Sequence, residues 1–344
     1  MPHDLSELEA PFGESEIKEA VFSLPSVKAP GPDGFIGAFY KSCWEIIKGD
    51  TIAAITHMSL HCGGCTNLVN SANIVLLPKK EDATAVGDYR PISLIHSLSK
   101  IFSKLLANRL APFLTTLVSK CQSAFVKKRS IHDNFLHVQN LIKELHSSKT
   151  PSLFLKLDIS KAFDSVGWAY LLEVLTAIGF GPRWREWICL SLASATSRVL
   201  LNGDPGTPFT HARGLRQGDP LSPMLFILAI DPLQRILSLA TDHGILSPIK
   251  SRTARCRVSL YADDAGIFSN PVKEELHAMS AILDCFGKAS GLITNMAKTE
   301  IFPIRCDAID LPDILSDFPA KIGTFPGKYL GLPLHYRQIG RAHF

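Results

Sequence analysis

The chain has 344 residues, and 46% of them are hydrophobic, which is enough to bury a large core in two average domains or in one larger unit. Its formal net charge of +4 is compatible with a nucleic-acid partner but is too small to identify one. The sequence has no low-complexity segment and no internal repeat, and its longest apolar run, Met224–Ile230, is far shorter than the ~20 residues needed to cross a bilayer. Composition therefore excludes a repeat protein and gives no reason to expect a membrane-spanning one.

The N-terminal segment predicts a helix followed by a loop. Ser15 can cap the helix, and Ile17, Val21 and Leu24 then share one face. The segment 28–34 (KAPGPDG) must be a loop, because its prolines break helices and its glycines allow dihedral angles that other residues avoid.

The eight cysteines are scattered along a chain without a recognisable secretory signal, so we expect reduced thiols rather than disulfides. Cys62 and Cys65 have the spacing of a zinc-binding pair, and His61 stands beside them. A structural zinc site needs four ligands, however, and no second pair follows nearby. The sequence therefore does not favour a zinc site.

Amphipathic helices alternate with short apolar strands along the rest of the chain. Apolar residues recur on one face in 97–110, 131–145 and 274–290, and the last of these helices should stop at Gly291, a residue suited to the position after a helix. Short strands are expected at roughly 73–77, 152–158, 198–202, 256–262, 265–269 and 299–303. This order predicts an α+β fold with a mixed or antiparallel sheet and no clear linker between domains.

Two adjacent acidic residues, Asp263 and Asp264, stand between apolar runs where a hairpin should reverse. Asp is common in turns for structural reasons alone, so the pair is not specific by itself. A third carboxylate, Asp158, ends the buried strand expected at 152–158. Close like charges raise one another's pKa, and Mg²⁺, which prefers carboxylate oxygens, relieves that cost. The three aspartates together predict a site for two Mg²⁺ ions roughly 3.5–4 Å apart.

These aspartates stand among sequence blocks that resemble a known family. Tyr261–Asp264 (YADD), the strand-end Asp158 and the segment 214–223 (GLRQGDPLSP) are similar to the palm of reverse transcriptases. Further matching blocks follow in the same order: 73–80 (NIVLLPKK), 88–94 (DYRPISL), 122–134 (QSAFVKKRSIHDN), 290–301 (SGLITNMAKTEI) and 328–334 (KYLGLPL). With 28–34 before them, the blocks resemble the plant-like, LINE-type non-LTR retrotransposons.

The resemblance implies an RNA-directed DNA polymerase, a nucleotidyltransferase that extends a DNA primer with dNTPs on an RNA template. It also implies a right-hand polymerase fold, in which the sheet of the palm packs on helices and the fingers adjoin it. On this basis 1–64 would be an extension leading into the fingers, 65–305 the fingers and palm, and 306–344 the primer-grip hairpin and a truncated start of the thumb. A non-LTR element would act in the nucleus.

The family motifs imply roles in catalysis. Asp158 and Asp263 would bridge both ions, with Mn²⁺ as an alternative to Mg²⁺, and Asp264 would be the outer carboxylate. Lys298 resembles the lysine that protonates the leaving pyrophosphate; an exposed lysine without a role is the alternative. Phe163 would pack beneath the sugar and exclude a 2′-hydroxyl by steric means, unless it is an ordinary core residue.

Basic residues of the fingers would bind the incoming nucleotide. Lys79, or its neighbour Lys80, and Arg90 would clamp the triphosphate, because lysine and the planar guanidinium of arginine both suit phosphate oxygens. A salt bridge from Arg90 to Asp88 is the alternative for Arg90.

The segment 216–219 (RQGD) and a basic stretch imply further nucleic-acid contacts. Gln217 and Gly218 would lie close to the new base pair, because glycine lets the backbone approach a ligand. Asp219 is expected to cap the following helix rather than to bind metal. The stretch 127–129 (KKR) suits a template backbone, and a solvated face is its alternative.

Tyr329, Leu330 and Gly331 resemble the primer grip, with Gly331 in a tight turn and Tyr329 as an aromatic surface. The sequence departs from the family at Lys128, where members often have glycine, which puts the local geometry in doubt. We expect neither an endonuclease nor most of the thumb, because about a dozen residues precede the first helix and the chain stops at Phe344.

Two other functions are alternatives. A polymerase like those of group II introns or RNA-copying viruses is one, but Phe163 and the blocks at 28–34 and 328–334 argue against it. A truncated remnant that binds RNA without polymerising is the other, and the three retained aspartates disfavour long decay.

Overall fold

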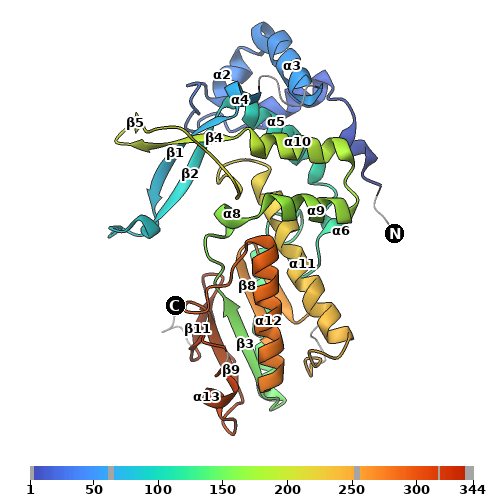
Figure 1. The fold of residues 1–344 in the computed structure, drawn as a ribbon, viewed down its shortest axis with the longest axis vertical. Helices are drawn as coiled ribbons and strands as arrows, with labels where there is room; N and C mark the ends of the chain where they lie inside the picture. Colours follow the sequence, from blue (N-terminus) through green and yellow to red (C-terminus); the bar gives the residue numbers. More distant parts are fainter. Residues whose placement is uncertain (1–3, 61–65, 252–255, 317, 338–344) are drawn as a thin grey trace. The chain divides into compact units, whose positions relative to one another are not determined.

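In the computed structural model (Figure 1), residues 4–60, 66–251, 256–316 and 318–337 are described. The chain forms two compact units, and each is built from two separate stretches of sequence. Unit 1 comprises Met1–Phe113 and Val166–Phe226, and unit 2 comprises Leu114–Ser165 and Ile227–Phe344. The chain passes between the units within or directly beside helices, which explains why no linker stands out in the sequence.

Unit 1 contains helices from both of its stretches: η1 Ser6–Glu9, α1 Glu14–Ser23, α2 Gly37–Ser42, α3 Trp44–Leu60, α4 Thr66–Val69, η2 Val86–Asp88, α5 Ser97–Leu110, α9 Trp168–Ile178 and α10 Pro182–Ala193. Helix α5 has the predicted bounds, and Ile101 and Leu105 of its apolar face are fully buried. Helix α1 differs slightly from expectation: its N-cap is Gly13, so Ser15 lies within the first turn and does not cap it.

A five-stranded sheet belongs to unit 1, with the order β2-β1-β4-β5 and with β6 also paired to β4. Its strands are β1 Ser71–Pro78, β2 Tyr89–Ile95, β4 Thr196–Leu201, β5 Asp204–Pro205 and β6 Phe209–Thr210. Strands β1 and β2 form a long antiparallel hairpin (Figure 1), and β4 joins β1 in parallel. The strands expected at 73–77 and 198–202 are confirmed within two residues.

Unit 2 is built around a second five-stranded sheet, with the order β10-β9-β3-β8-β7. Its strands are β3 Ser152–Leu157, β7 Val258–Tyr261, β8 Asp264–Ser269, β9 Glu300–Ile304 and β10 Lys321–Ile322, and a separate hairpin pairs β11 Gly327–Tyr329 with β12 Leu332–Leu334. Its helices are α6 Leu114–Leu117, α7 Ile131–Ser147, α8 Ala162–Ser165, most of α11 Ser222–Asp242, α12 Lys273–Ser290 and α13 Leu311–Ile314. Strands β9 and β10 are parallel and the other pairs are antiparallel, so the predicted mixed sheet is confirmed.

Strand β3 is central in this sheet, as its apolar run predicts. Phe154 lies in register with Phe268 of β8 and Phe302 of β9, and the three rings belong to one buried cluster. Helix α7 and the β11–β12 hairpin contribute Val138 and Tyr329 to the same cluster. The residues on either side of Phe154 in β3 are buried as well. Because they project to the opposite face, both faces of the strand are covered by protein.

The cysteines require one correction. Cys121 and Cys256 form a disulfide within unit 2, so the expectation of reduced thiols is wrong for this pair. The fold brings together residues that lie 135 positions apart, and a count of cysteines cannot show such proximity. The zinc-like pair Cys62 and Cys65 lies outside the described residues.

Among the described residues, α11 is the one helix whose length and composition would let it cross a membrane. More than half of its most apolar stretch is buried inside the protein. Asp231, in its middle, is also buried; its carboxylate accepts hydrogen bonds from Arg235 Nε at 3.0 Å and from the backbone N–H of Ser119 at 2.8 Å. A paired, buried carboxylate on an apolar helix is typical of a protein core.

Candidate active site

The tip of the β7–β8 hairpin holds the two adjacent aspartates. Tyr261 pairs with Asp264, so Ala262 and Asp263 form a two-residue turn, as the sequence predicts. Ala262 has φ +53° whereas Asp263 has a negative φ, which is the φ pattern of a type II′ turn. Glycine usually occupies that first position, and a non-glycine residue there stores strain of order 1–3 kcal/mol.

Asp158 is presented beside this turn by the neighbouring strand. Leu157 pairs with Ala265, so the next position along β3 places Asp158 opposite Asp264. Directly opposed residues of antiparallel strands project to the same face. The loop before β9 braces the backbone of Asp158: its carbonyl accepts from Asn295 N–H at 2.7 Å, and its own N–H donates to Thr299 Oγ1 at 3.4 Å. Of the two turn aspartates, Asp264 rather than Asp263 therefore lies directly opposite Asp158 in the strand register.

The three carboxylates influence one another electrostatically. Loss of surrounding water is the main cause that raises the pKa of Asp264, and the negative charges of Asp263 and Asp158 raise it further. Lys156 opposes this rise. Nearby negative charges with too little compensation favour the binding of a cation.

A hard divalent cation fits this donor set, because all three side chains offer carboxylate oxygens. Across the part of the chain that the structure describes, however, no three Asp, Glu, His or Cys side chains converge closely enough to hold a metal ion as they lie. The donor chemistry thus fits Mg²⁺, whereas the predicted two-ion arrangement stays a prediction.

Lys156 is a charged neighbour that sequence reasoning missed. It stands two residues before Asp158, so strand alternation places both on one face, and its Nζ lies 2.9 Å from Glu300 Oε2 on β9. The alternation that located Asp158 could have identified Lys156, but its pairing with Glu300 depends on the order of the strands.

Phe163 follows Asp158 by five residues in the chain, and Lys298 lies in the loop that is hydrogen-bonded to the backbone of Asp158. Phe163 is on α8, which begins after Lys161 turns the chain with φ +46°, and its ring is half-buried. Two helices, α8 and α9, follow Asp158, and they are separated because Gly167 is the extended N-cap of α9. Lys298 is exposed and belongs to the loop that bonds to Asp158. The position of each is compatible with its predicted role, and both roles stay predictions.

The predicted primer-grip segment forms a hairpin in unit 2. Tyr329 pairs with Leu332, and Leu330 and Gly331 form the turn with φ +50° and +81°, as in a type I′ turn. Tyr329 cannot serve as the expected aromatic surface, because its side chain is only 1% exposed. Its hydroxyl lies 2.9 Å from Ser259 Oγ of β7, and burial raises its pKa. Tyr329 therefore packs against the β7–β8 hairpin that carries the aspartates, through its contact with Ser259.

The basic residues predicted to bind the triphosphate belong to unit 1, around the end of the β1–β2 hairpin. Lys80 pairs with Asp88 at 3.0 Å, and Lys79 Nζ donates to the carbonyl of Gly87 at 2.9 Å. Arg90 is exposed and, among the described residues, has no carboxylate within salt-bridge distance, so its suggested bridge to Asp88 is not formed. Lys80 thus contacts a carboxylate and Lys79 a backbone carbonyl, and the role of each lysine and of Arg90 in binding phosphate stays a prediction.

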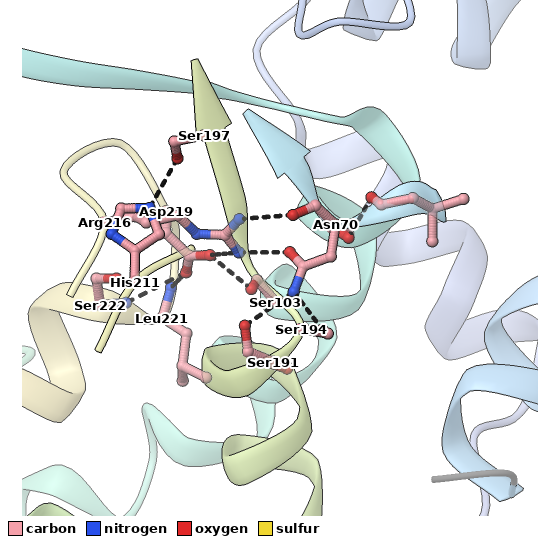
Figure 2. A network of polar contacts seen from close by, with 12 residues as sticks. Asn70, Ser103, Ser191, Ser194, Ser197, His211, Arg216, Asp219, Leu221 and Ser222 are labelled. Atoms are coloured by element: carbon pink, nitrogen blue, oxygen red, sulfur yellow. Dashed lines mark hydrogen bonds and ion pairs between the residues drawn. The ribbon is translucent and has the colours of Figure 1, made fainter. Parts of the chain in front are cut away.

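Asp219 has a structural role, as expected. Its carboxylate accepts from the N–H groups of Leu221 and Ser222 at 2.8 and 3.3 Å, which caps the start of α11. Figure 2 shows the same carboxylate meeting Ser103 of α5, whose hydroxyl donates at 2.8 Å.

Arg216 was not predicted, although it begins the RQGD segment. Its guanidinium lies between Asn70 and Asp219 (Figure 2), with 2.7 Å to Asn70 Oδ1 and 3.7 Å to Asp219 Oδ2. Burial lowers the pKa of Arg216, and the charge of Asp219 offsets that effect. His211 extends the network through Ser197 Oγ at 2.7 Å, and burial together with Arg216 lowers its pKa.

Gln217 and Gly218 pack on the backbone of β2. The carbonyl of Gln217 accepts from Ser93 N–H at 2.7 Å. Gly218 has φ +112°, and a Cβ atom there would lie 2.7 Å from the Ser93 carbonyl oxygen. Glycine is therefore required by contact with β2, and the predicted approach to a base pair stays a prediction.

Lys128, where the sequence departs from the family, has a left-handed backbone conformation. Lys128 has φ +67°, a conformation that glycine adopts without strain. Lysine at this position therefore holds a backbone conformation that glycine would adopt at lower cost. Arg129, in the same basic stretch, is engaged within the protein, since its guanidinium donates to the carbonyls of Ser119 and Gln122.

Comparison with known proteins gives consistent matches. The profile of the family described as "Reverse transcriptase (RNA-dependent DNA polymerase)" matches residues 77–334, well over half of the chain. The chain is 31% identical over 86% of its length to the transposon TX1 149 kDa protein of Xenopus laevis, and 28% identical over 99% to the Pol polyprotein of the retrotransposable element R2DM of Drosophila melanogaster. It is also 28% identical over 98% of its length to the RNA-directed DNA polymerase of the Drosophila melanogaster mobile element jockey.

These relatives are much longer than the chain, which spans 23%, 32% and 37% of their respective lengths. A solved structure of telomerase from Candida tropicalis, bound to a fragment of telomeric RNA, aligns with 68% of the chain and 41% of its own, with a TM-score of 0.47 and 14% identity.

Proposed function

The chain belongs to the reverse transcriptase family, with relatives among the non-LTR retrotransposons, and from this premise we propose that it extends a DNA primer with dNTPs on an RNA template. The observation that carries the proposal is the placement of Asp158 and the Asp263–Asp264 turn on adjacent strands of one sheet. In this reading unit 2 corresponds to the palm and unit 1 to the fingers.

Asp158, Asp263 and Asp264 are the residues that would hold divalent ions, which reverse transcriptases generally use. Bound Mg²⁺ supplies Lewis-acid activation of the primer 3′-hydroxyl and neutralisation of the triphosphate. The chain's own contribution is to hold the three carboxylates on one edge of the sheet, with the backbone of Asp158 fixed by Asn295 and Thr299. Among the described residues the three carboxylates do not converge as they lie, so they would turn towards a bound ion from this fixed backbone.

The remaining proposed roles follow from exposure and placement. Lys79 and Arg90 bind the phosphates of the incoming nucleotide, because both are exposed on the β1–β2 hairpin and neither pairs with a carboxylate there. Lys298 donates a proton to the leaving pyrophosphate. Phe163, whose ring is half-buried on α8 shortly after Asp158, excludes a ribose 2′-hydroxyl by steric means.

Primer extension by the purified chain, with an RNA template, Mg²⁺ and dNTPs, tests the proposal. Asp263→Ala should abolish extension, and Phe163→Ala should increase the use of rNTPs. Asp284→Ala is the matched control, because Asp284 is an exposed carboxylate on α12 that pairs with Lys288, four residues later.

Two results would contradict the proposal. Extension that persists in Asp263→Ala would remove the aspartate turn from the reaction. Salt-sensitive RNA binding without extension by the unaltered chain would identify a remnant that has lost the chemistry.

A further inference from the structure

The turn that carries Asp263 is held by a residue from a distant part of unit 2. Gln122 is fully buried, and its Oε1 accepts a hydrogen bond from the backbone N–H of Ala262 at 3.2 Å. The same oxygen accepts from Ala124 N–H at 2.9 Å. Two backbone donors at one atom identify it as the oxygen of the amide, because the amide nitrogen cannot accept.

The segment around Gln122 also lies against β7 as an additional short strand. Gln122 forms a parallel bridge with Leu260, the Leu260 N–H donates to the Cys121 carbonyl at 2.9 Å, and the Ser123 N–H donates to the Leu260 carbonyl at 3.0 Å. The guanidinium of Arg129 donates to the carbonyl of Gln122 at 2.6 Å, which fixes the segment from its other side. The side chain of Gln122 thus contacts Ala262 from a segment that hydrogen bonds hold on both sides.

The contact falls on the strained residue of the turn. Ala262 has φ +53°, and the hydrogen bond from its N–H to Gln122 is made in that conformation. An L-residue in the left-handed region persists only where its surroundings hold it there. The next residue is Asp263, so rotation of the Ala262 backbone would move that carboxylate directly.

The amide nitrogen of Gln122 gives a further indication. Among the described residues, Nε2 is buried and has no hydrogen-bond partner. An unpaired buried donor destabilises the fold, so the amide as a whole is a poor choice for stability alone. Its oxygen, by contrast, accepts two hydrogen bonds, one from Ala124 of its own segment and one from Ala262 of the turn.

We propose that Gln122 is a positioning residue that holds Ala262 in the left-handed conformation and so orients Asp263 for nucleotidyl transfer. This inference rests on the proposed polymerase function, and its structural part can be tested without it. The contact is between residues 140 positions apart, and it links the 122–134 block to the YADD turn.

The first test replaces the amide with an apolar side chain of similar length, Gln122→Met. We expect backbone amides of 260–264 to exchange with deuterium about tenfold faster than amides elsewhere in unit 2, because the turn opens more often. The melting temperature should fall as well, because the N–H groups of Ala262 and Ala124 lose their acceptor. Gln234→Met is the matched control, since Gln234 is a partly buried residue of α11 whose amide bonds to Ser238 on the same helix.

The second test uses a suppressor. Glycine adopts φ +53° without strain, so Ala262→Gly should reduce the need for Gln122. In primer extension, Gln122→Met should lower kcat about tenfold with KM for dNTP nearly unchanged, because small misplacement of a reacting group is costly. The double variant Gln122→Met/Ala262→Gly should recover most of that loss, which a general loss of packing would not do.

The outcomes separate the two proposals. Unchanged exchange at 260–264 together with unchanged kcat in Gln122→Met would overturn the positioning role, and so would additive losses in the double variant. If the unaltered chain extends no primer, the polymerase proposal fails, and the exchange measurement still decides the structural part. If Gln122→Met does not fold, Gln122→Asn withdraws the oxygen from Ala262 by one methylene and replaces it in both tests; normal exchange and kcat would then overturn the inference.

Discussion

Two acidic turns, one in each unit, show how differently a protein can treat a carboxylate. Asp219 in unit 1 is buried, and its oxygens meet two backbone N–H groups, the Ser103 hydroxyl and the Arg216 guanidinium. Asp264 in unit 2 keeps exposed surface but has lost part of its surrounding water, faces other negative charges and has a raised pKa. The satisfied carboxylate maintains the fold, whereas the uncompensated one is suited to a cation.

The largest expected effect is on activity at the uncompensated turn. Asp158→Ala should lower primer extension by at least on the order of 10³-fold, because it removes a carboxylate from the edge proposed to bind metal. The melting temperature without Mg²⁺ should stay the same or rise, since a like charge near Asp264 is removed. Single-turnover extension and thermal unfolding measure the two effects. A large loss of stability would show that Asp158 maintains the fold, as Asp219 does, and would contradict the difference drawn between the two turns.

At the satisfied turn the expected effect is on stability. Asp219→Ala should lower the free energy of unfolding by about 3–5 kcal/mol, because the buried Arg216 loses its counter-charge. Asp284→Ala, which removes an exposed carboxylate, should change it by less than about 0.5 kcal/mol. Urea unfolding compares the two variants. Equal values would show that Asp219 is not the partner on which Arg216 depends.

The RQGD segment should also be sensitive at Gly218. Gly218→Ala forces φ +112° on an L-residue and presses its Cβ on the Ser93 carbonyl, so we expect a loss of about 2–3 kcal/mol. Gly49→Ala is the control, because Gly49 lies in α3 with open space around it, and alanine there should stabilise the helix by about 1 kcal/mol. Denaturant unfolding measures the free energy of unfolding of both variants. A Gly218→Ala variant as stable as the unaltered chain would contradict the prediction.

The smallest expected effect is the pH dependence of Asp264. Its pKa is raised on folding, so the folded protein binds the proton more tightly than the unfolded chain, and ionisation at higher pH costs stability. Asp264→Asn should therefore be slightly more stable than the unaltered chain at neutral pH. The difference should disappear as the pH falls through the carboxyl range and Asp264 is protonated.

Melting temperatures across this pH range, without divalent ions, measure the difference. Mg²⁺ should stabilise the unaltered chain more than Asp264→Asn, because a ligand that binds only the folded state stabilises it. A pH-independent difference between the two proteins would contradict the raised pKa.

The sequence alone predicted much of the local structure. Apolar periodicity placed α5, α7 and α12 within two residues, because one face of each helix must be buried. The YADD hairpin was also predicted, and so was the strand leading to Asp158, which ends one residue earlier than expected, since short alternating runs and paired turn residues leave few alternatives. The resemblance to reverse transcriptases pointed to the family, with which the comparisons agree.

Only the tertiary structure decided which side chains meet. The burial of Tyr329, the pairing of Lys80 with Asp88 and the disulfide between Cys121 and Cys256 depend on how distant segments pack. The same holds for Arg216 against Asn70 and for the oxygen of Gln122 at Ala262, contacts across 146 and 140 positions. Local patterns determine which face of an element is apolar, but hydrogen bonds and ion pairs act over a few ångströms, so their partners are set only when the strands and helices have been placed.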